Sequence, residues 1–149
     1  MTRGWRVARR PFADLSGEGA RIAGGRWNSP GRPLVYTAEN PALAVLEVRV
    51  HLDLAPDLIP DDYVLLEIDV SGLDVEKLAA VPVNPTAFGD QWLAEGRTPV
   101  LKVPSFAVPR SFNLLINPLH PAAKGASVVD SQPFDFDKRL WLPLAAATP

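Results

Sequence analysis

The stretch GGRWNSPGRPLVYTAENPALAVLEV, residues 24–48, contains in succession a glycine-rich loop, a short strand and a helix. Residues 33–38 carry β-branched and aromatic side chains, and they predict the strand. Asn40 can cap a helix, and Pro41 suits the first helical position, where a missing N–H costs nothing. We therefore expect a helix from Pro41 to about Leu52.

This expected helix carries one carboxylate beside its apolar face. Leu43, Leu46 and Val50 recur at helical spacing and should form the buried stripe. Glu47 then lies at the edge of that stripe, which is unfavourable for a carboxylate unless it has a partner or a chemical task. An ion pair with a nearby arginine is the structural alternative to a task in chemistry.

The rest of the chain predicts many short elements, because 16 prolines and 10 glycines are spread along it. Residues 17–33 are rich in glycine and should form an ordered loop. Ala87–Glu95 should be a helix that ends at Gly96. Further strands are expected at Trp5–Ala8, Asp62–Val70, Val100–Val103, Ser111–Ile116 and Phe134–Trp141. Strands outnumber helices, so the sequence predicts an α+β fold with short mixed or antiparallel sheets and a few helices.

Size and composition predict one domain over residues 1–149. The chain has 149 residues, of which 47% are hydrophobic, enough for a core of its own. We expect residues 142–149 to be a flexible tail or to pack against a partner. No apolar run is long enough for a membrane span or a signal peptide, so we expect a cytoplasmic protein. With no cysteine and two histidines, we also expect no disulfide, no metal site and no resident cofactor.

Positive charge gathers at the start of the chain. Seven arginines in the first 32 residues face only Asp14 and Glu18, so this segment carries about +5 and the remainder about −7. The planar guanidinium group suits phosphate and carboxylate ligands. Because the whole chain has a pI near 5.6, a compact phosphorylated ligand fits better than a long nucleic acid. We interpret Arg3, Arg9 and Arg10 as charges that attract this ligand.

Four segments together resemble the RES domain family, which is named for an arginine, a glutamate and a serine. They are GGRWNSPGRPLVYTAENPALAVLEV at 24–48, GDQWL at 89–93, KVPSFAVP at 102–109 and NLLINPLHP at 113–121. The resemblance implies a fold similar to that of ADP-ribosyltransferases of the diphtheria-toxin kind. It also implies the toxin of a bacterial type II toxin–antitoxin pair, restrained by an Xre-like antitoxin, which depletes NAD+ by cleaving its nicotinamide–ribose bond.

The chemistry of that reaction suits three residues as a catalytic set. Nicotinamide leaves NAD+ as a neutral molecule, so the enzyme needs no strong general acid and must instead stabilise positive charge on the ribose. Glu47, on a rigid helix, is the candidate for that task. The resemblance assigns Arg26 to a phosphate or the nicotinamide ribose, and Tyr36 to stacking on the nicotinamide ring.

The residues expected to bind substrate are Arg6, Gly25, Trp27, Asn28 and Ser105. Arg6 is assigned to the pyrophosphate. Gly25 belongs to a glycine pair whose backbone amides are free to point together at an anion. Trp27 and Asn28 should shape the loop.

The serine of the family name is assigned to Ser105, which should orient Glu47 or a ribose hydroxyl. Ser127 is the alternative. Neither is proposed as a nucleophile, because no histidine stands in a recognisable triad to serve as its base.

These assignments require Glu47, Arg6 and Arg26 to converge on one pocket sized for the nicotinamide mononucleotide part of NAD+. The acceptor of the ADP-ribosyl group is left open between water, phosphate and a protein side chain. A non-catalytic module that binds RNA or a partner protein through its arginines is the alternative to an enzyme.

Overall fold

The computed structural model describes residues 1–141, and the expected tail at 142–149 lies outside them. The described residues form one seven-stranded sheet with three α-helices, which confirms the α+β prediction. The strands are β1 (Arg3–Arg9), β2 (Val35–Ala38), β3 (Tyr63–Asp69), β4 (Val75–Lys77), β5 (Val100–Pro104), β6 (Phe112–Ile116) and β7 (Ser127–Pro133). The helices are α1 (Glu18–Ala23), α2 (Pro41–His51) and α3 (Pro85–Glu95), with 3₁₀ turns at Arg10–Phe12, Pro56–Leu58, Pro121–Gly125 and Lys138–Trp141.

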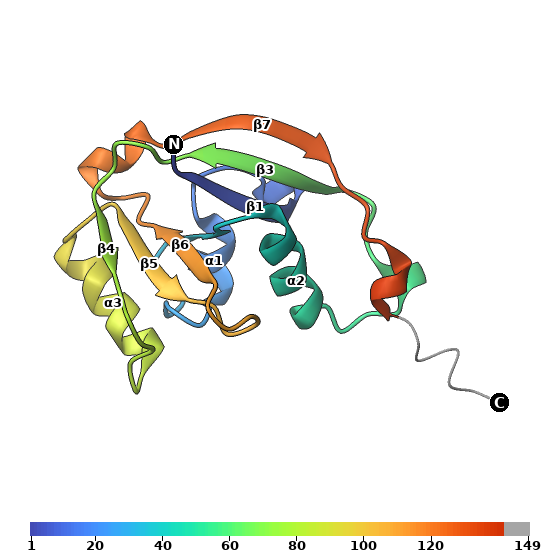
Figure 1. The fold of residues 1–149 in the computed structure, drawn as a ribbon, viewed down its shortest axis with the longest axis horizontal. Coiled ribbons are helices and arrows are strands. Elements are labelled where there is room, and N and C mark those ends of the chain that lie inside the picture. Colours follow the sequence, from blue (N-terminus) through green and yellow to red (C-terminus); the bar gives the residue numbers. More distant parts are fainter. Residues whose placement is uncertain (142–149) are drawn as a thin grey trace.

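The sheet consists of two halves that are weakly joined at its centre (Figure 1). Its strand order is β4-β5-β6-β2-β1-β3-β7, with β4 parallel to β5 and the other described neighbours antiparallel. β1 pairs with β3 along its whole length, but it pairs with β2 at Trp5↔Ala38 alone. Because no further ladder hydrogen bonds join them, β1 and β2 diverge on either side of that position.

Apolar side chains cover both faces of the sheet. One face carries a cluster around Leu66 and Ile116. The other face carries two separate clusters: one packs α2 against the sheet through Leu43, and the other packs α3 against β5 through Trp92 and Leu101. The two clusters on this second face leave space between them, and a cleft lies there.

Local sequence signals placed the two long helices correctly. The Asn40 side chain accepts a hydrogen bond of 2.8 Å from the Leu43 N–H, and Pro41 begins α2 as predicted. Gly96 adopts the left-handed conformation that ends α3. Among residues 1–141, none of the helices combines the length and the apolar character needed to cross a bilayer.

The predicted loop at 17–33 is wrong in part, because it contains α1. Gly17, with a φ of 71°, precedes this helix, and Gly24, with a φ of 72°, follows it. Glycines therefore bound the helix, whereas the sequence prediction treated them as evidence against one.

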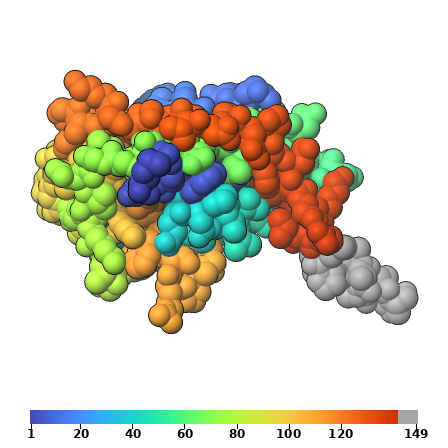
Figure 2. All heavy atoms as spheres, turned by 45° about the horizontal axis from the view of Figure 1, so that its top comes forward, coloured from blue at the N-terminus to red at the C-terminus, as the bar shows by residue number. Residues whose placement is uncertain are grey.

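The last predicted strand is also wrong. Phe134–Trp141 is irregular and ends in a 3₁₀ turn, and its aromatic rings stack edge to face, Phe134 on Phe136 and Phe136 on Trp141. The real strand, β7, lies just before it and crosses the surface in Figure 2. All seven residues of β7 are exposed, so no apolar alternation marks it, and pairing with β3 makes it a strand. The short β4 was not predicted at all.

The buried face of α2 differs from the predicted stripe. Leu43 is buried, but Leu46 is 38% and Val50 is 63% exposed. The helix is apolar on nearly every side, so spacing alone does not select the face that packs against the sheet. The face that packs includes Leu43 and Ala44, and Glu47 follows them one turn later, toward the cleft.

Candidate active site

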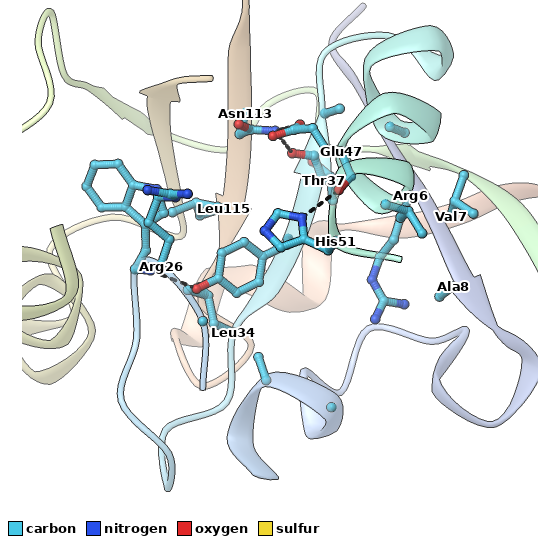
Figure 3. Close-up of a pocket in the computed structure, with 18 of the residues that line it drawn as sticks. Arg6, Val7, Ala8, Arg26, Leu34, Thr37, Glu47, His51, Asn113 and Leu115 are labelled. Carbon is cyan, nitrogen blue, oxygen red and sulfur yellow. Dashed lines mark hydrogen bonds between the residues drawn. The ribbon is translucent and has the colours of Figure 1, made fainter. Parts of the chain in front are cut away.

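A cleft of about 890 Å³ opens between the two halves of the sheet. β1 supplies one wall, the turn at Gly25–Trp27 and the side chain of Tyr36 supply the opposite wall, and α2 lies between them. In Figure 3, Glu47 and His51 of α2 lie between Arg26 on one side and Arg6 on the other. The predicted convergence of the acid and the two arginines on one cavity is therefore found.

Glu47 is half-buried in this cleft and is held by a strand far away in the sequence. The amide Nδ2 of Asn113, on β6, donates a hydrogen bond to Glu47 Oε1 and another, of 3.1 Å, to the carbonyl of Thr37. Burial raises the pKa of Glu47, while the Asn113 amide, His51, Ser105 and Arg26 oppose that rise. The carboxylate is thus partly desolvated, fixed in orientation and surrounded by groups that favour its charge.

Asn113 and His51 are the site residues that sequence reasoning missed. Asn113 is the one polar residue in the apolar strand FNLLI, which was the available signal. His51 lies one turn after Glu47 on α2. Its Nδ1 lies 2.7 Å from the carbonyl oxygen of Glu47, and the residue lines the cleft.

Arg26 lies at the tip of a tight turn. Gly25 and Asn28 form an isolated bridge, in which the Gly25 N–H donates to the Asn28 carbonyl at 2.9 Å. The Gly24 N–H donates to the carbonyl of Ala20 at 2.8 Å. The expected anion nest from the glycine pair is therefore wrong, because both amides are already used within the protein. Gly25 supplies space instead, since a Cβ there would lie 2.5 Å from the Tyr36 hydroxyl oxygen.

Asn28 and Tyr36 fix the shape of that turn. Asn28 is buried, and its Nδ2 donates to the carbonyls of Ala20 and Arg32 at 2.9 and 3.0 Å. The Tyr36 hydroxyl donates to Asn28 Oδ1 at 2.6 Å and accepts from the Trp27 N–H at 3.0 Å. Burial raises the pKa of Tyr36 to about 12, so the hydroxyl remains a donor at neutral pH. The prediction that Trp27 and Asn28 shape the loop is confirmed.

The Arg26 side chain itself is exposed, and it lies flat on an aromatic ring. Its Cζ is 3.6 Å from the centroid of the Phe106 ring. Within the described part of the chain, no carboxylate pairs with it. Its hydrogen-bonding edge is therefore available to a ligand.

Arg6 enters the cleft from β1. Its Nη1 donates a hydrogen bond of 2.5 Å to the carbonyl of Phe12. Burial lowers the pKa of Arg6, and the charge of Asp14 opposes that effect. A partly buried guanidinium of this kind favours a negatively charged ligand, which would compensate its lost hydration.

Ser105 and Ser127 differ in their relation to Glu47. Ser105 directly precedes Phe106 and Ala107, which line the cleft, and it opposes the rise in the pKa of Glu47. Ser127 begins β7 at the sheet edge, is exposed and pairs with Asp69. Ser105 is therefore the serine that affects the pKa of the carboxylate, and its role as the serine of the family name stays a prediction.

Two of the arginines expected to attract ligand form ion pairs within the protein. Arg3 pairs with Glu67 at 3.2 Å and with Asp69 at 2.9 Å on the neighbouring strand. Arg9 pairs with Asp62 at 2.8 Å. The basic segment is thus partly neutralised, and three of its seven arginines, Arg6, Arg9 and Arg26, line the cleft. Among residues 1–141, no group of three His, Cys, Asp or Glu side chains is arranged to hold a metal ion.

Known proteins match this chain over nearly its whole length. The RES domain family matches residues 3–137. A Sphingobium sp. (strain YBL2) protein named "Prs ADP-ribosylating toxin" is 40% identical over 156 residues, which cover 91% of this chain and 94% of that protein. A Pseudomonas putida protein named "Toxin Res" is 37% identical over 145 residues, which cover 92% and 98%. The crystal structure of the M. tuberculosis MbcT-MbcA toxin-antitoxin complex aligns with a TM-score of 0.71 at 23% identity, covering 97% of this chain and 89% of that chain, so the fold is shared.

Proposed function

Since this chain belongs to the RES domain family, we propose that it is the toxin of a toxin–antitoxin pair and that it cleaves the nicotinamide–ribosyl bond of NAD+. The names of its relatives support the toxin role, and one of them is described as ADP-ribosylating. The single observation that carries the chemical part is the position of Glu47, desolvated and oriented by Asn113 in a cleft with a guanidinium on either side.

The cleft suits a dinucleotide in size and charge. About 890 Å³ falls within the range of small-molecule sites, which is roughly 300–1,000 Å³. Arg6 and Arg26 offer two separate forks of N–H donors for the phosphates. We assign Arg6 to the pyrophosphate, as the sequence suggested, and Arg26 to a phosphate or the nicotinamide ribose.

Bond cleavage in this proposal needs little proton transfer. The bond between C1′ of the ribose and the nicotinamide nitrogen breaks, and its electron pair neutralises the pyridinium ring, which leaves as nicotinamide. Positive charge develops on C1′ and the ring oxygen, where the Glu47 carboxylate stabilises it. A lone pair of the acceptor then forms the new bond to C1′, and any proton on the acceptor atom passes to solvent.

Several neighbours support the carboxylate in this step. Asn113 keeps Glu47 in one orientation, and His51, one turn along α2, adds a polar surface beside it. The Tyr36 hydroxyl is occupied by Trp27 and Asn28, but its ring lines the cleft. The ring is therefore available to pack against nicotinamide, the role that the sequence suggested.

The acceptor divides the proposal into two candidates. Water or phosphate would make the protein an NAD+-depleting enzyme, which is the first candidate. A protein side chain would make it an ADP-ribosyltransferase, and the name of the Sphingobium relative favours this second candidate. Both candidates share the bond cleavage at Glu47.

One experiment separates these candidates. Purified protein is incubated with NAD+ labelled in its adenosine part, in buffer alone, with inorganic phosphate, and with cell-extract protein. We expect nicotinamide release, with ADP-ribose, phosphorylated ADP-ribose or labelled protein identifying the acceptor. Absence of nicotinamide in every arm, from a preparation that still arrests cells, would contradict the proposal and favour a non-catalytic binding module.

An antitoxin completes the proposal, because an NAD+-consuming toxin requires restraint in its own cell. The family resemblance suggests an Xre-like protein that masks the cleft, and the fold shared with the toxin of a toxin-antitoxin complex agrees with such a partner. Co-expression with the protein of the adjacent reading frame should yield a stable complex that neither binds nor cleaves NAD+. A complex that retains full NAD+ cleavage would contradict masking of the cleft.

A further inference from the structure

The loop between β5 and β6 supplies one side of the cleft mouth and projects from the body of the protein (Figure 1). Its most prominent side chain is Phe106, an aromatic ring that is 46% exposed. This ring contacts two successive residues of the opposite turn. Arg26 lies over its face, with Cζ 3.6 Å from the centroid, and Trp27 meets it edge to face at 6.5 Å.

The loop holds Phe106 in a defined position. The hydroxyl oxygen of Ser105 accepts hydrogen bonds from the N–H groups of Ala107 and Val108 at 3.0 and 3.3 Å. The Ser105 N–H donates to the carbonyl of Ser111 at 2.7 Å and closes the loop. Hydrogen bonds therefore fix the residues on both sides of Phe106, Ser105 and Ala107. The backbone at Phe106 is held in place although its ring is partly exposed.

Trp27 strengthens this placement from the other side. It is buried and also packs edge to face on Phe88 of α3, with centroids 6.5 Å apart. Phe106 thus continues an aromatic row that begins in the core and ends at the solvent. Arg26 covers the end of that row.

Arg26 has little else to hold it. Apart from the ring, none of the described residues hydrogen-bonds its guanidinium, whereas Arg6 is tied to the carbonyl of Phe12. A free arginine side chain samples many rotamers, and a ligand must then fix it at an entropic cost. A stack on one face of the guanidinium removes much of that freedom and leaves its N–H edge open.

We infer that Phe106 is a positioning residue, which stacks on Arg26 and presents the guanidinium edge to the phosphate or ribose oxygens of the substrate. This inference rests on the proposed function for the identity of the substrate. It adds a residue that the family resemblance did not select, and it assigns the β5–β6 loop a role in substrate affinity.

Variants at position 106 separate stacking from simple apolar contact. Phe106→Leu keeps an apolar side chain of similar size without a π face, whereas Phe106→Tyr keeps the ring. We expect Phe106→Leu to raise the KM for NAD+ about three- to tenfold, with kcat changed by less than about twofold, and Phe106→Tyr to restore the wild-type KM. Equal KM values for the leucine and tyrosine variants would overturn the inference.

A double-mutant comparison tests whether Phe106 acts through Arg26. In an Arg26→Ala background, Phe106→Leu should have no further effect on KM, because the group that it positions is gone. Effects of the two changes that simply multiply would contradict the inference and assign Phe106 an independent contact with substrate.

A readout without turnover keeps this inference separate from the proposed function. Protons of Arg26 that lie over an aromatic face have upfield NMR shifts. Those shifts should be present in the free wild-type protein and in Phe106→Tyr, and absent in Phe106→Leu. If NAD+ is not cleaved but the shifts behave in this way, the proposed function fails and the stacking of Arg26 stands. If wild-type Arg26 has ordinary shifts, the inference fails whatever the enzyme does.

Discussion

The two walls of the cleft hold their arginines by different means. On one wall, Arg6 belongs to β1, a strand paired along its whole length with β3, and its guanidinium is tied to a backbone carbonyl. On the other wall, Arg26 stands at the tip of a turn, exposed, with an aromatic ring as its support. The turn itself is rigid, because Asn28 and Tyr36 hold it from within.

This difference shows how a charge can be positioned without an acidic partner. An ion pair would hold Arg26 equally well, but it would occupy the N–H groups that a phosphate needs. Stacking and internal hydrogen bonds orient the side chain and leave those groups unused. Glu47 lies between the two walls. Asn113 on the sheet and Arg26 on the turn both favour its charged form.

The largest expected effect comes from the residue between the walls. Glu47→Gln should lower kcat for NAD+ cleavage by about 10²–10³-fold, because the charge that stabilises the ribosyl cation is lost while both arginines remain. NAD+ affinity should change little. The stability of the variant at neutral pH should not fall, because a carboxyl whose pKa is raised by burial favours its neutral form in the folded state.

A matched control is Glu95→Gln on α3, a carboxylate outside the cleft that pairs with Arg97. It should retain wild-type cleavage. Equal activity of the two glutamine variants would contradict a role for Glu47, and a lower melting temperature of Glu47→Gln would show that the residue stabilises the fold.

The next largest effect is on the KM for NAD+, and it should differ between the arginines of the two walls. Arg26→Lys should raise the KM for NAD+ about tenfold, because an ammonium group provides neither the flat stack on Phe106 nor a bidentate fork. Arg6→Lys should raise it only about threefold, because an amine can still donate to the Phe12 carbonyl and still carries a charge. Steady-state kinetics of the two variants test this order, and the reverse order would remove the distinction between the walls.

A smaller effect is expected from the hydroxyl that supports the turn. Tyr36→Phe keeps the ring but leaves Asn28 Oδ1 and the Trp27 N–H without their partner, at a cost of about 1–3 kcal/mol in the free energy of unfolding. Cleavage should fall only severalfold, because the ring still lines the cleft. Chemical denaturation and KM measurements check both values, and unchanged stability would show that Tyr36 does not hold the turn.

The smallest effect concerns pH. The ionised form of Glu47 is the active one, so cleavage should decline as pH falls through its pKa, at a higher pH than an ordinary glutamate would give, because burial raises that pKa. Ser105 opposes the rise, so Ser105→Ala should move the acid limb of kcat/KM to still higher pH. An acid limb that stays in place would mean that Ser105 supports only the β5–β6 loop.

Signals confined to neighbouring residues predicted the fold well. The cap at Asn40 and Pro41 and the stop at Gly96 involve contacts within a few residues, and both were read correctly. β7 was missed because its seven exposed residues become a strand only through pairing with β3. The buried face of α2 was misjudged because an apolar helix does not reveal which side the sheet will cover.

The candidate site was predicted mainly through the family resemblance. The resemblance selected Glu47 and Arg26, which both line the cleft, whereas the apolar stripe that drew attention to Glu47 is not the buried face of α2. Asn113 was not found, because its contact with Glu47 joins residues 66 positions apart. The amides of the glycine pair were misassigned, because the carbonyl groups that accept them become known only when the turn is folded.

The most direct test is a crystal structure of the Glu47→Gln variant with NAD+ bound. We expect density for NAD+ in the cleft between β1 and the Gly25–Asn28 turn. C1′ of the nicotinamide ribose should contact residue 47, and Arg6 and Arg26 should contact the phosphates or the ribose. NAD+ bound elsewhere, or bound with its nicotinamide end turned away from residue 47, would contradict this expectation.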